Sequence, residues 1–152
     1  MKTMIVTEHL GFSELNYSIF SNVNKIVSSS LKEVSIVPMD VSNKMMQILT
    51  AVMNVSEMSS FSDGVVIAAN IDHAKEIASL VTNSRKLLYL WDLDWMYKKM
   101  SFIEVYEILN NPKLDIIVRS KTHQNVVDKL LKNKKTLGIV KTFDLEKIWN
   151  LL

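Results

Sequence analysis

The chain has 152 residues, with 18 Lys or Arg against 16 Asp or Glu, and 48% of its residues are hydrophobic. This composition excludes a disordered chain, and no apolar run approaches the roughly 18 residues that a membrane-spanning helix needs. The absence of Cys excludes disulfides, thiolate metal sites and a cysteine nucleophile. A net charge of +2 does not by itself imply nucleic acid or an anionic membrane as a partner.

No repeat, low-complexity tract or linker divides the sequence, so we expect one domain over residues 1–152. The most polar stretch, residues 56–63, is too short to separate two hydrophobic cores. Residues 1–6 lead straight into an apolar run without the basic and apolar regions of a signal peptide. We therefore expect a cytoplasmic protein.

Short β-branched runs alternate with helical patterns along the chain. The strands expected from these runs are residues 4–7, 34–37, 51–55, 64–69, 86–91, 115–118 and 137–140. The helices expected from apolar periodicity are residues 13–31, 71–81, 101–109, 120–131 and 144–151. Residues 42–58 fit either a helix or a buried strand, and we favour a short strand near residues 51–55. Ser101 with Glu104 three residues later is typical of a capping box.

Strands that alternate with helices of about ten residues predict a parallel sheet with helices on both faces. The expected fold class is therefore α/β, a Rossmann-like three-layer α/β/α sandwich with a mainly parallel sheet. Such sheets bind ligands in the crevice beyond the carboxyl ends of their strands. The residues that follow each strand are accordingly the candidates for a functional site.

Polar side chains and one glycine follow four of the expected strands. In chain order they are Glu8, His9 and Gly11; Asn70, Asp72 and His73; Asp92 and Asp94; and Arg119, Ser120 and His123. All three histidines of the chain belong to this set. A structural role in loops and helix caps is the alternative for each histidine, and it is slightly favoured for His9 and His123 and more clearly favoured for His73. No two histidines have ligand spacing, so we predict no metal site.

Asp92 and Asp94 stand two residues apart, which in an extended segment places both carboxylates on one side. Such a pair suits a general base or a divalent ion with phosphates, while capping and solvation are the equally weighted alternative. The flanking Trp91 and Trp95 suit either a stacking wall or an anchor that holds the loop in the core.

Arg119 and Ser120 precede an expected helix, where free N–H groups favour an anion such as a phosphate. An ordinary surface ion pair is the alternative for Arg119. The sequence contains no G-x-G-x-x-G, no P-loop and no G-x-S-x-G motif. We therefore predict no cofactor.

Four segments together resemble the N-terminal half of a GT-B glycosyltransferase, including the short proteins of this kind that tailed phages encode. They are TEHLGFS (residues 7–13), LWDLDW (90–95), IIVRS (116–120) and LGIV (137–140). The resemblance implies that His9 and Gly11 belong to an acceptor-side loop. It places Asp92 and Asp94 on the cleft wall, and Arg119 with Ser120 at the edge that faces a second domain.

On this resemblance the function is sugar transfer from a nucleotide sugar to an acceptor. His9 and Asp92 are the candidate catalytic residues, with His9 as the base. The candidate binding residues are Glu8, Gly11, Asp94, Arg119, Ser120 and His123. Because this chain ends where the family continues into its donor-binding domain, transfer is expected to require a partner chain or a homodimer.

Two alternatives remain open at this point. The first is a non-catalytic binding or assembly module that keeps the Rossmann-like fold and offers an apolar patch near residues 45–58 or 149–152. The second is a small-molecule enzyme of another Rossmann-like class. The fold alone does not decide among them, since this architecture hosts many chemistries.

Overall fold

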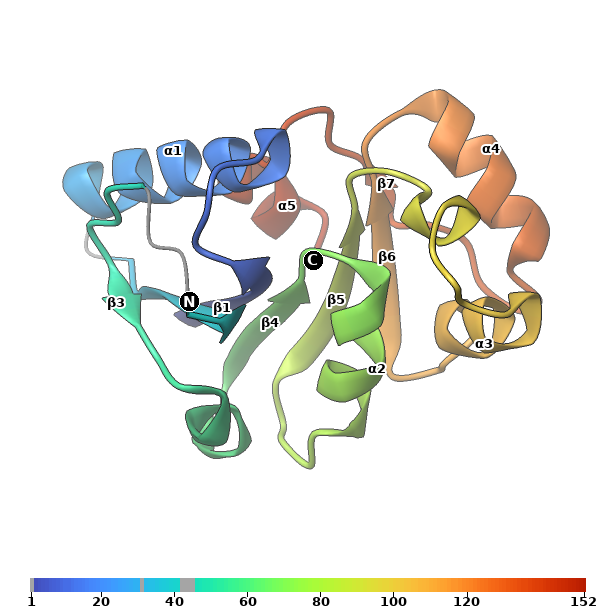
Figure 1. Cartoon of the computed structure of the whole chain (residues 1–152), viewed down its shortest axis with the longest axis horizontal. Coiled ribbons are helices and arrows are strands. Elements are labelled where there is room, and N and C mark those ends of the chain that lie inside the picture. Colours follow the sequence, from blue (N-terminus) through green and yellow to red (C-terminus); the bar gives the residue numbers. More distant parts are fainter. Residues whose placement is uncertain (1, 31, 42–45) are drawn as a thin grey trace.

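The computed structural model describes residues 2–30, 32–41 and 46–152. Within these residues seven strands form one sheet, in the order β3-β2-β1-β4-β5-β6-β7, and every neighbouring pair is parallel (Figure 1). The strands are β1 (Lys2–His9), β2 (Val34–Asp40), β3 (Ala51–Val52), β4 (Gly64–Ala68), β5 (Arg85–Leu90), β6 (Leu114–Val118) and β7 (Gly138–Ile139). The α/β class and Rossmann-like sheet expected from the sequence are confirmed.

Helices cover both faces of the sheet (Figure 1). They are α1 (Glu14–Ser29), α2 (Ile71–Ser79), α3 (Phe102–Leu109), α4 (Lys121–Leu130) and α5 (Leu145–Asn150), with the 3-10 helices η1 (Val55–Ser60) and η2 (Asp94–Met96). Helices α1 and α5 pack in one hydrophobic cluster. Helices α2, α3 and α4 pack with η1 in a second cluster on the opposite face. These two clusters make the three layers.

The central strands are apolar on both sides because both faces of the sheet are covered. In β4, residues 65–68 are each 3% exposed or less, and in β5 residues 87–90 are fully buried. This burial is why a continuous apolar run, rather than an alternating one, predicts these strands.

A polar side chain starts each of the five α-helices by accepting a hydrogen bond from a backbone N–H of the first turn. The capping residues are Ser13, Asn70, Ser101, Ser120 and Asp144. The cap at Ser101 is the one expected from the capping-box pattern, and its hydroxyl accepts the N–H of Glu104 at 3.2 Å. These caps fix where the loops after β1, β4 and β6 turn into helices.

The segment after β2 differs in detail from the expectation. Residues 42–45 and Leu31 lie outside the described residues. Residues 46–58 contain no α-helix, so the short strand that was favoured over a helix is the element found there. Strand β3 is present but ends at Val52, because the backbone N–H of Asn54 donates to the carboxylate of Glu57 at 2.6 Å and the chain turns into η1. Helix η2 was also not expected from the sequence.

The order of the strands creates a crevice beside β1. The chain runs from β1 outward to β2 and β3, then returns to the other side of β1 for β4. Helix α1 leaves β1 toward one face and α2 leaves β4 toward the other. The loops at these two strand ends therefore diverge, which is the switch point where ligands of such sheets bind.

Candidate functional site

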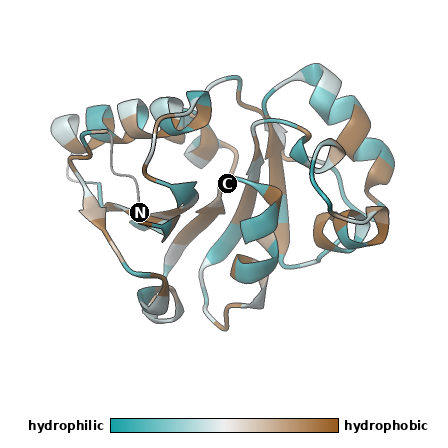
Figure 2. Cartoon of the chain, in the orientation of Figure 1, coloured by the Kyte–Doolittle hydropathy of each residue, from teal (hydrophilic) through white to brown (hydrophobic). Residues whose placement is uncertain are grey.

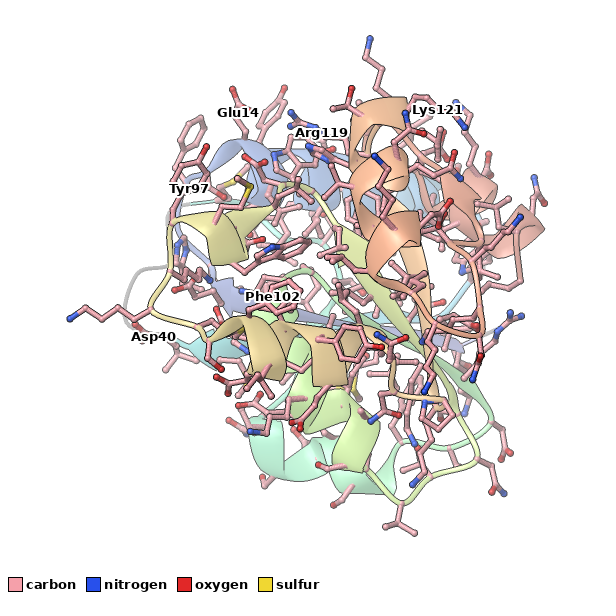
Figure 3. The ribbon with its side chains drawn as sticks, turned by 90° about the vertical axis from the view of Figure 1, so that its right-hand side faces the viewer. Glu14, Asp40, Tyr97, Phe102, Arg119 and Lys121 are labelled. Atoms are coloured by element: carbon pink, nitrogen blue, oxygen red, sulfur yellow. The ribbon has the colours of Figure 1, made fainter. Side chains whose placement is uncertain are left out.

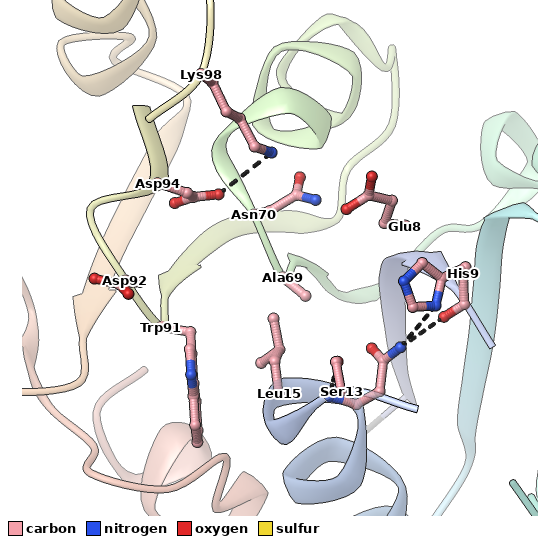
Figure 4. A pocket seen from close by; sticks show the side chains of 11 residues that line it. Glu8, His9, Ser13, Leu15, Ala69, Asn70, Trp91, Asp92, Asp94 and Lys98 are labelled. Carbon is pink, nitrogen blue, oxygen red and sulfur yellow. Dashed lines mark hydrogen bonds and ion pairs between the residues drawn. The ribbon is translucent and has the colours of Figure 1, made fainter. Parts of the chain in front are cut away.

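A hollow of about 280 Å³ lies at this switch point, and we call it the switch-point cleft (Figure 4). The ends of β1, β4 and β5, the start of α1 and the η2 segment supply its walls. The lining residues are Glu8, His9, Ser13, Leu15, Asn16, Ala69, Asn70, Trp91, Asp92, Asp94 and Lys98. Four of the eight sequence-predicted site residues line it together: Glu8, His9, Asp92 and Asp94.

The imidazole of His9 is fixed by the loop that follows it. The backbone N–H of Gly11 donates to Nδ1 of His9 at 3.0 Å. The buried side chain of Asn16 donates through Nδ2 to the carbonyl oxygens of His9 (3.0 Å) and Gly11 (2.8 Å). Because a backbone N–H only donates, Nδ1 is an acceptor, and a neutral His9 carries its proton on Nε2.

This tautomer bears on the role expected for His9. A neutral ring with its proton on Nε2 offers a hydrogen-bond donor to a ligand. To act as a base at Nε2, His9 would have to place its proton on Nδ1 and lose the bond from Gly11. The geometry thus favours a donor role, and the base role remains a prediction that the structure does not support.

Lys98 is held among carboxylates on the opposite side of the cleft. Its Nζ pairs with Asp72 and lies 3.5 Å from the carboxylate of Asp94 (Figure 4). Burial acts to lower the pKa of Lys98, but Asp72, Asp94 and Glu8 outweigh it, so the pKa is raised and the ammonium is kept. Burial raises the pKa of Asp94, partly opposed by Lys98. The described lining of the cleft thus contains three carboxylates, Glu8, Asp92 and Asp94, and one ammonium group, that of Lys98.

Trp91 forms the aromatic wall of the cleft. The Cζ of Arg119 lies 4.5 Å from the centroid of the Trp91 ring. The fully buried ring of Tyr89 lies 6.5 Å from the Trp91 ring, centroid to centroid, and packs edge-on to the ring of Phe143 at 5.0 Å. These contacts hold the indole in one place. Of the two tryptophans considered for a stacking wall, Trp91 lines the cleft, whereas Trp95 packs against the core on the other face of the sheet.

The remaining sequence-predicted residues lie beside the cleft rather than in its lining. Arg119 stacks on Trp91, and its expected contact with a phosphate stays a prediction. Ser120 caps α4 by accepting the N–H of His123 at 3.1 Å. Nε2 of His123 lies 3.7 Å from Oδ1 of Asp92. Gly11 acts through its backbone on His9.

Lys98 and Asn16 are among the lining residues that the sequence analysis missed. Lys98 stands four residues after Asp94, and this i,i+4 spacing of opposite charges was a usable signal. Asn16 lies inside the first turn of α1, where no sequence pattern separates it from an ordinary helical Asn.

His73 is a buried group next to the cleft, as its expected structural role implies. Its side chain is 9% exposed, Nδ1 lies 3.5 Å from the carboxylate of Glu76, and Nε2 has no hydrogen-bond partner among the described residues. Burial lowers the pKa of His73 from its ordinary value, against the opposing pull of Glu76, Asp72 and Glu8.

We expect acid to destabilise the protein through His73. Because the folded-state pKa lies below the ordinary 6.5, the unfolded chain takes up this proton first as the pH falls. The contribution of His73 to the free energy of unfolding is complete above about pH 6.5. As the pH falls below this value, that contribution is lost by at most about 1.4 kcal/mol per pH unit. Urea unfolding across this range checks the slope, and His73→Leu should remove part of it. An unchanged slope in that variant would contradict the role of His73.

Among residues 2–30, 32–41 and 46–152, no group of three or more His, Asp or Glu side chains is arranged to hold a metal ion. In the same residues no helix is both long and apolar enough to cross a bilayer.

Comparison with models of known protein families, with curated protein sequences and with solved structures gives no significant match. The switch-point cleft is therefore the feature of this chain that bears on its function.

Proposed function

We propose that this chain binds a neutral sugar in the switch-point cleft, as the acceptor-binding half of a glycosyl transfer. The observation that carries the proposal is the combination of one aromatic wall, Trp91, with three carboxylates in a single small hollow. The parallel Rossmann-like sheet agrees with the resemblance to GT-B glycosyltransferases only at the level of the fold.

The lining matches the chemistry of a sugar ring, which carries hydroxyl groups around its edge and C–H groups on its faces. Glu8, Asp92 and Asp94 supply carboxylate oxygens, which accept strong hydrogen bonds from hydroxyl groups. Trp91 supplies a flat apolar surface against which a ring packs. His9 adds a donor through Nε2 for a ligand oxygen.

The charge of the cleft disfavours an anionic ligand. Lys98 is the one ammonium group in the described lining, and it is already paired with Asp72 and Asp94. A phosphate placed there would face three carboxylates at short range. We therefore assign the diphosphate of a nucleotide-sugar donor to a site outside this cleft, on a partner chain or a second copy.

In the transfer we assign to the site, the acceptor hydroxyl oxygen forms the new bond to the anomeric carbon of the donor. The bond from that carbon to the nucleotide diphosphate breaks, and its electron pair leaves with the diphosphate. Asp92 takes the hydroxyl proton, and His123, at 3.7 Å, helps to orient its carboxylate. On this assignment Asp92→Asn abolishes transfer but retains sugar binding.

Calorimetric titration with glucose, galactose, mannose and N-acetylglucosamine tests the binding proposal, with glucose 6-phosphate as the anionic comparison. We expect saturable binding of at least one neutral sugar and weaker or no binding of the phosphate. Glu8→Gln should weaken binding by about tenfold or more, since a hydrogen bond to a charged group contributes about 1.5–3 kcal/mol.

The matched control is Glu33→Gln, because Glu33 is exposed and pairs with Lys2, outside the cleft. This variant should bind as the unmodified protein does. Preferred binding of glucose 6-phosphate, or no binding of any neutral sugar at millimolar concentration, would contradict the proposal.

The assembly module remains the second candidate because of one observation. Large apolar side chains are exposed at the end of η2 and the start of α3, namely Met96, Tyr97, Phe102 and Ile103. Tyr97 and Phe102 are labelled in Figure 3, and Figure 2 colours parts of α3 as hydrophobic. The expected patches also carry exposed apolar side chains, namely Leu49, Val52 and Val55 in the first and Leu151 in the second, whereas Met58 is buried, Trp149 is partly buried and Met45 lies outside the described residues. A stable oligomer in light scattering that dissociates on Ile103→Glu and binds no sugar would favour this candidate.

A further inference from the structure

A second hollow, of about 480 Å³, continues from the switch-point cleft along α1, and we call it the α1 groove. Its lining residues are Glu14, Tyr17, Ser18, Ser21, Asn22, Lys25, Trp91, Thr142 and Phe143. Trp91 lines both hollows. Glu14 and Arg119, the residue that stacks on Trp91, lie along the same edge of the molecule (Figure 3).

One wall of the groove is an exposed stripe of α1. Glu14, Tyr17, Ser21 and Lys25 follow one another at spacings of three or four residues, so they project from the same side of the helix. The other wall is the segment between β7 and α5, which contributes Thr142 and Phe143.

Two hydrogen bonds join the walls at the floor of the groove, so the groove is formed without a ligand. The hydroxyl of Ser18 accepts the backbone N–H of Phe143 at 2.9 Å. The side-chain oxygen of Asn22 accepts the N–H of Leu145 at 3.0 Å. In contrast, the side chains of Ser21 and Lys25 form no hydrogen bond or ion pair with any other described residue, so their polar groups are available to a ligand.

The two hollows together leave room for a ligand longer than one ring. Ligand pockets commonly span about 300–1,000 Å³. The cleft alone, at about 280 Å³, falls just short of this range, and it comes within the range once the groove is added.

We propose that the α1 groove holds the second ring of an oligosaccharide whose terminal ring occupies the switch-point cleft. This inference rests on the proposed function. The ligand crosses at Trp91, and its second ring packs beside Tyr17, with Ser21 and Lys25 as hydrogen-bonding partners.

The test compares a monosaccharide that binds with disaccharides that carry the same sugar at the non-reducing end, linked 1→3, 1→4 or 1→6. At least one disaccharide should bind about tenfold or more tightly than the monosaccharide. Ser21→Trp fills the groove, so it should abolish this gain and leave the affinity for the monosaccharide unchanged. Ser28→Trp, on an exposed position of α1 beyond the groove, is the matched control and should keep the gain.

The outcomes separate the two proposals. If the monosaccharide binds and no disaccharide binds more tightly, the groove is not a second subsite and this inference is wrong. The same conclusion follows if Ser21→Trp keeps the gain while its circular dichroism melt matches that of Ser28→Trp. If no sugar of either length binds, the proposed function itself fails.

Discussion

Replacing Trp91 with leucine is expected to weaken sugar binding by roughly ten- to a hundredfold while the protein stays folded. The indole lines both the switch-point cleft and the α1 groove. Loss of the apolar contact of one large side chain costs about 1.5–3 kcal/mol, which corresponds to that change in Kd. Calorimetric titration of the variant with the preferred sugar measures the effect.

Trp95→Leu is the matched control for this prediction. Trp95 is four residues away in sequence but packs against the core on the other face of the sheet. This variant should lose stability and keep the affinity for the sugar. If both substitutions weaken sugar binding equally, the loss comes from a general destabilisation of the fold. If Trp91→Leu leaves the affinity for the sugar unchanged, Trp91 does not belong to the binding site.

Gly64→Ala is expected to lower stability strongly, whereas Gly138→Ala is expected to have a small effect. A Cβ at position 64 would lie 2.6 Å from the backbone oxygen of Lys2 and 2.9 Å from Phe61. Because Gly64 pairs with Lys2 in the sheet, that oxygen moves only if β1 and β4 separate. Overpacking of this kind costs about 1–3 kcal/mol or more.

At Gly138 the added Cβ would meet the side chain of Leu151 at 2.9 Å. That leucine lies near the C-terminal end of the chain and is partly exposed, so it can rotate away. Thermal melts should show a fall of several degrees or more for Gly64→Ala, since each kcal/mol shifts Tm by roughly 2–4 °C in a protein of this size. Equal melting temperatures for the two variants would contradict the close approach of β1 and β4.

The helices and strands were largely predictable because the way each element is buried determines its pattern of apolar residues. The apolar run at residues 64–69 matches β4, which is covered on both faces. Residues 13–31 show one apolar stripe, and α1 buries Ile19, Val23 and Ile26 along it. The end of β3 was missed, although Asn54 with Glu57 three residues later has the same capping-box spacing as Ser101 with Glu104 and was a usable signal for the turn into η1.

The candidate site was predictable in position but not in its internal contacts. A parallel sheet brings the residues after its strands to one edge, and Glu8, His9, Asp92 and Asp94 line one cleft there. The tautomer of His9 depends on Gly11 and Asn16, whose side-by-side placement is a property of the folded loop. The stacking of Arg119 on Trp91 likewise requires two neighbouring strands in register.

Sugar binding at the switch point is best tested by the same titration followed by NMR through the indole N–H signals. The chain contains three tryptophans, and only Trp91 lines the switch-point cleft. We expect a neutral sugar to shift the Trp91 signal saturably, with the Kd found by calorimetry, while the signals of Trp95 and Trp149 stay in place. Absence of any shift at millimolar sugar, or a saturable shift confined to Trp149, would contradict binding at the switch point.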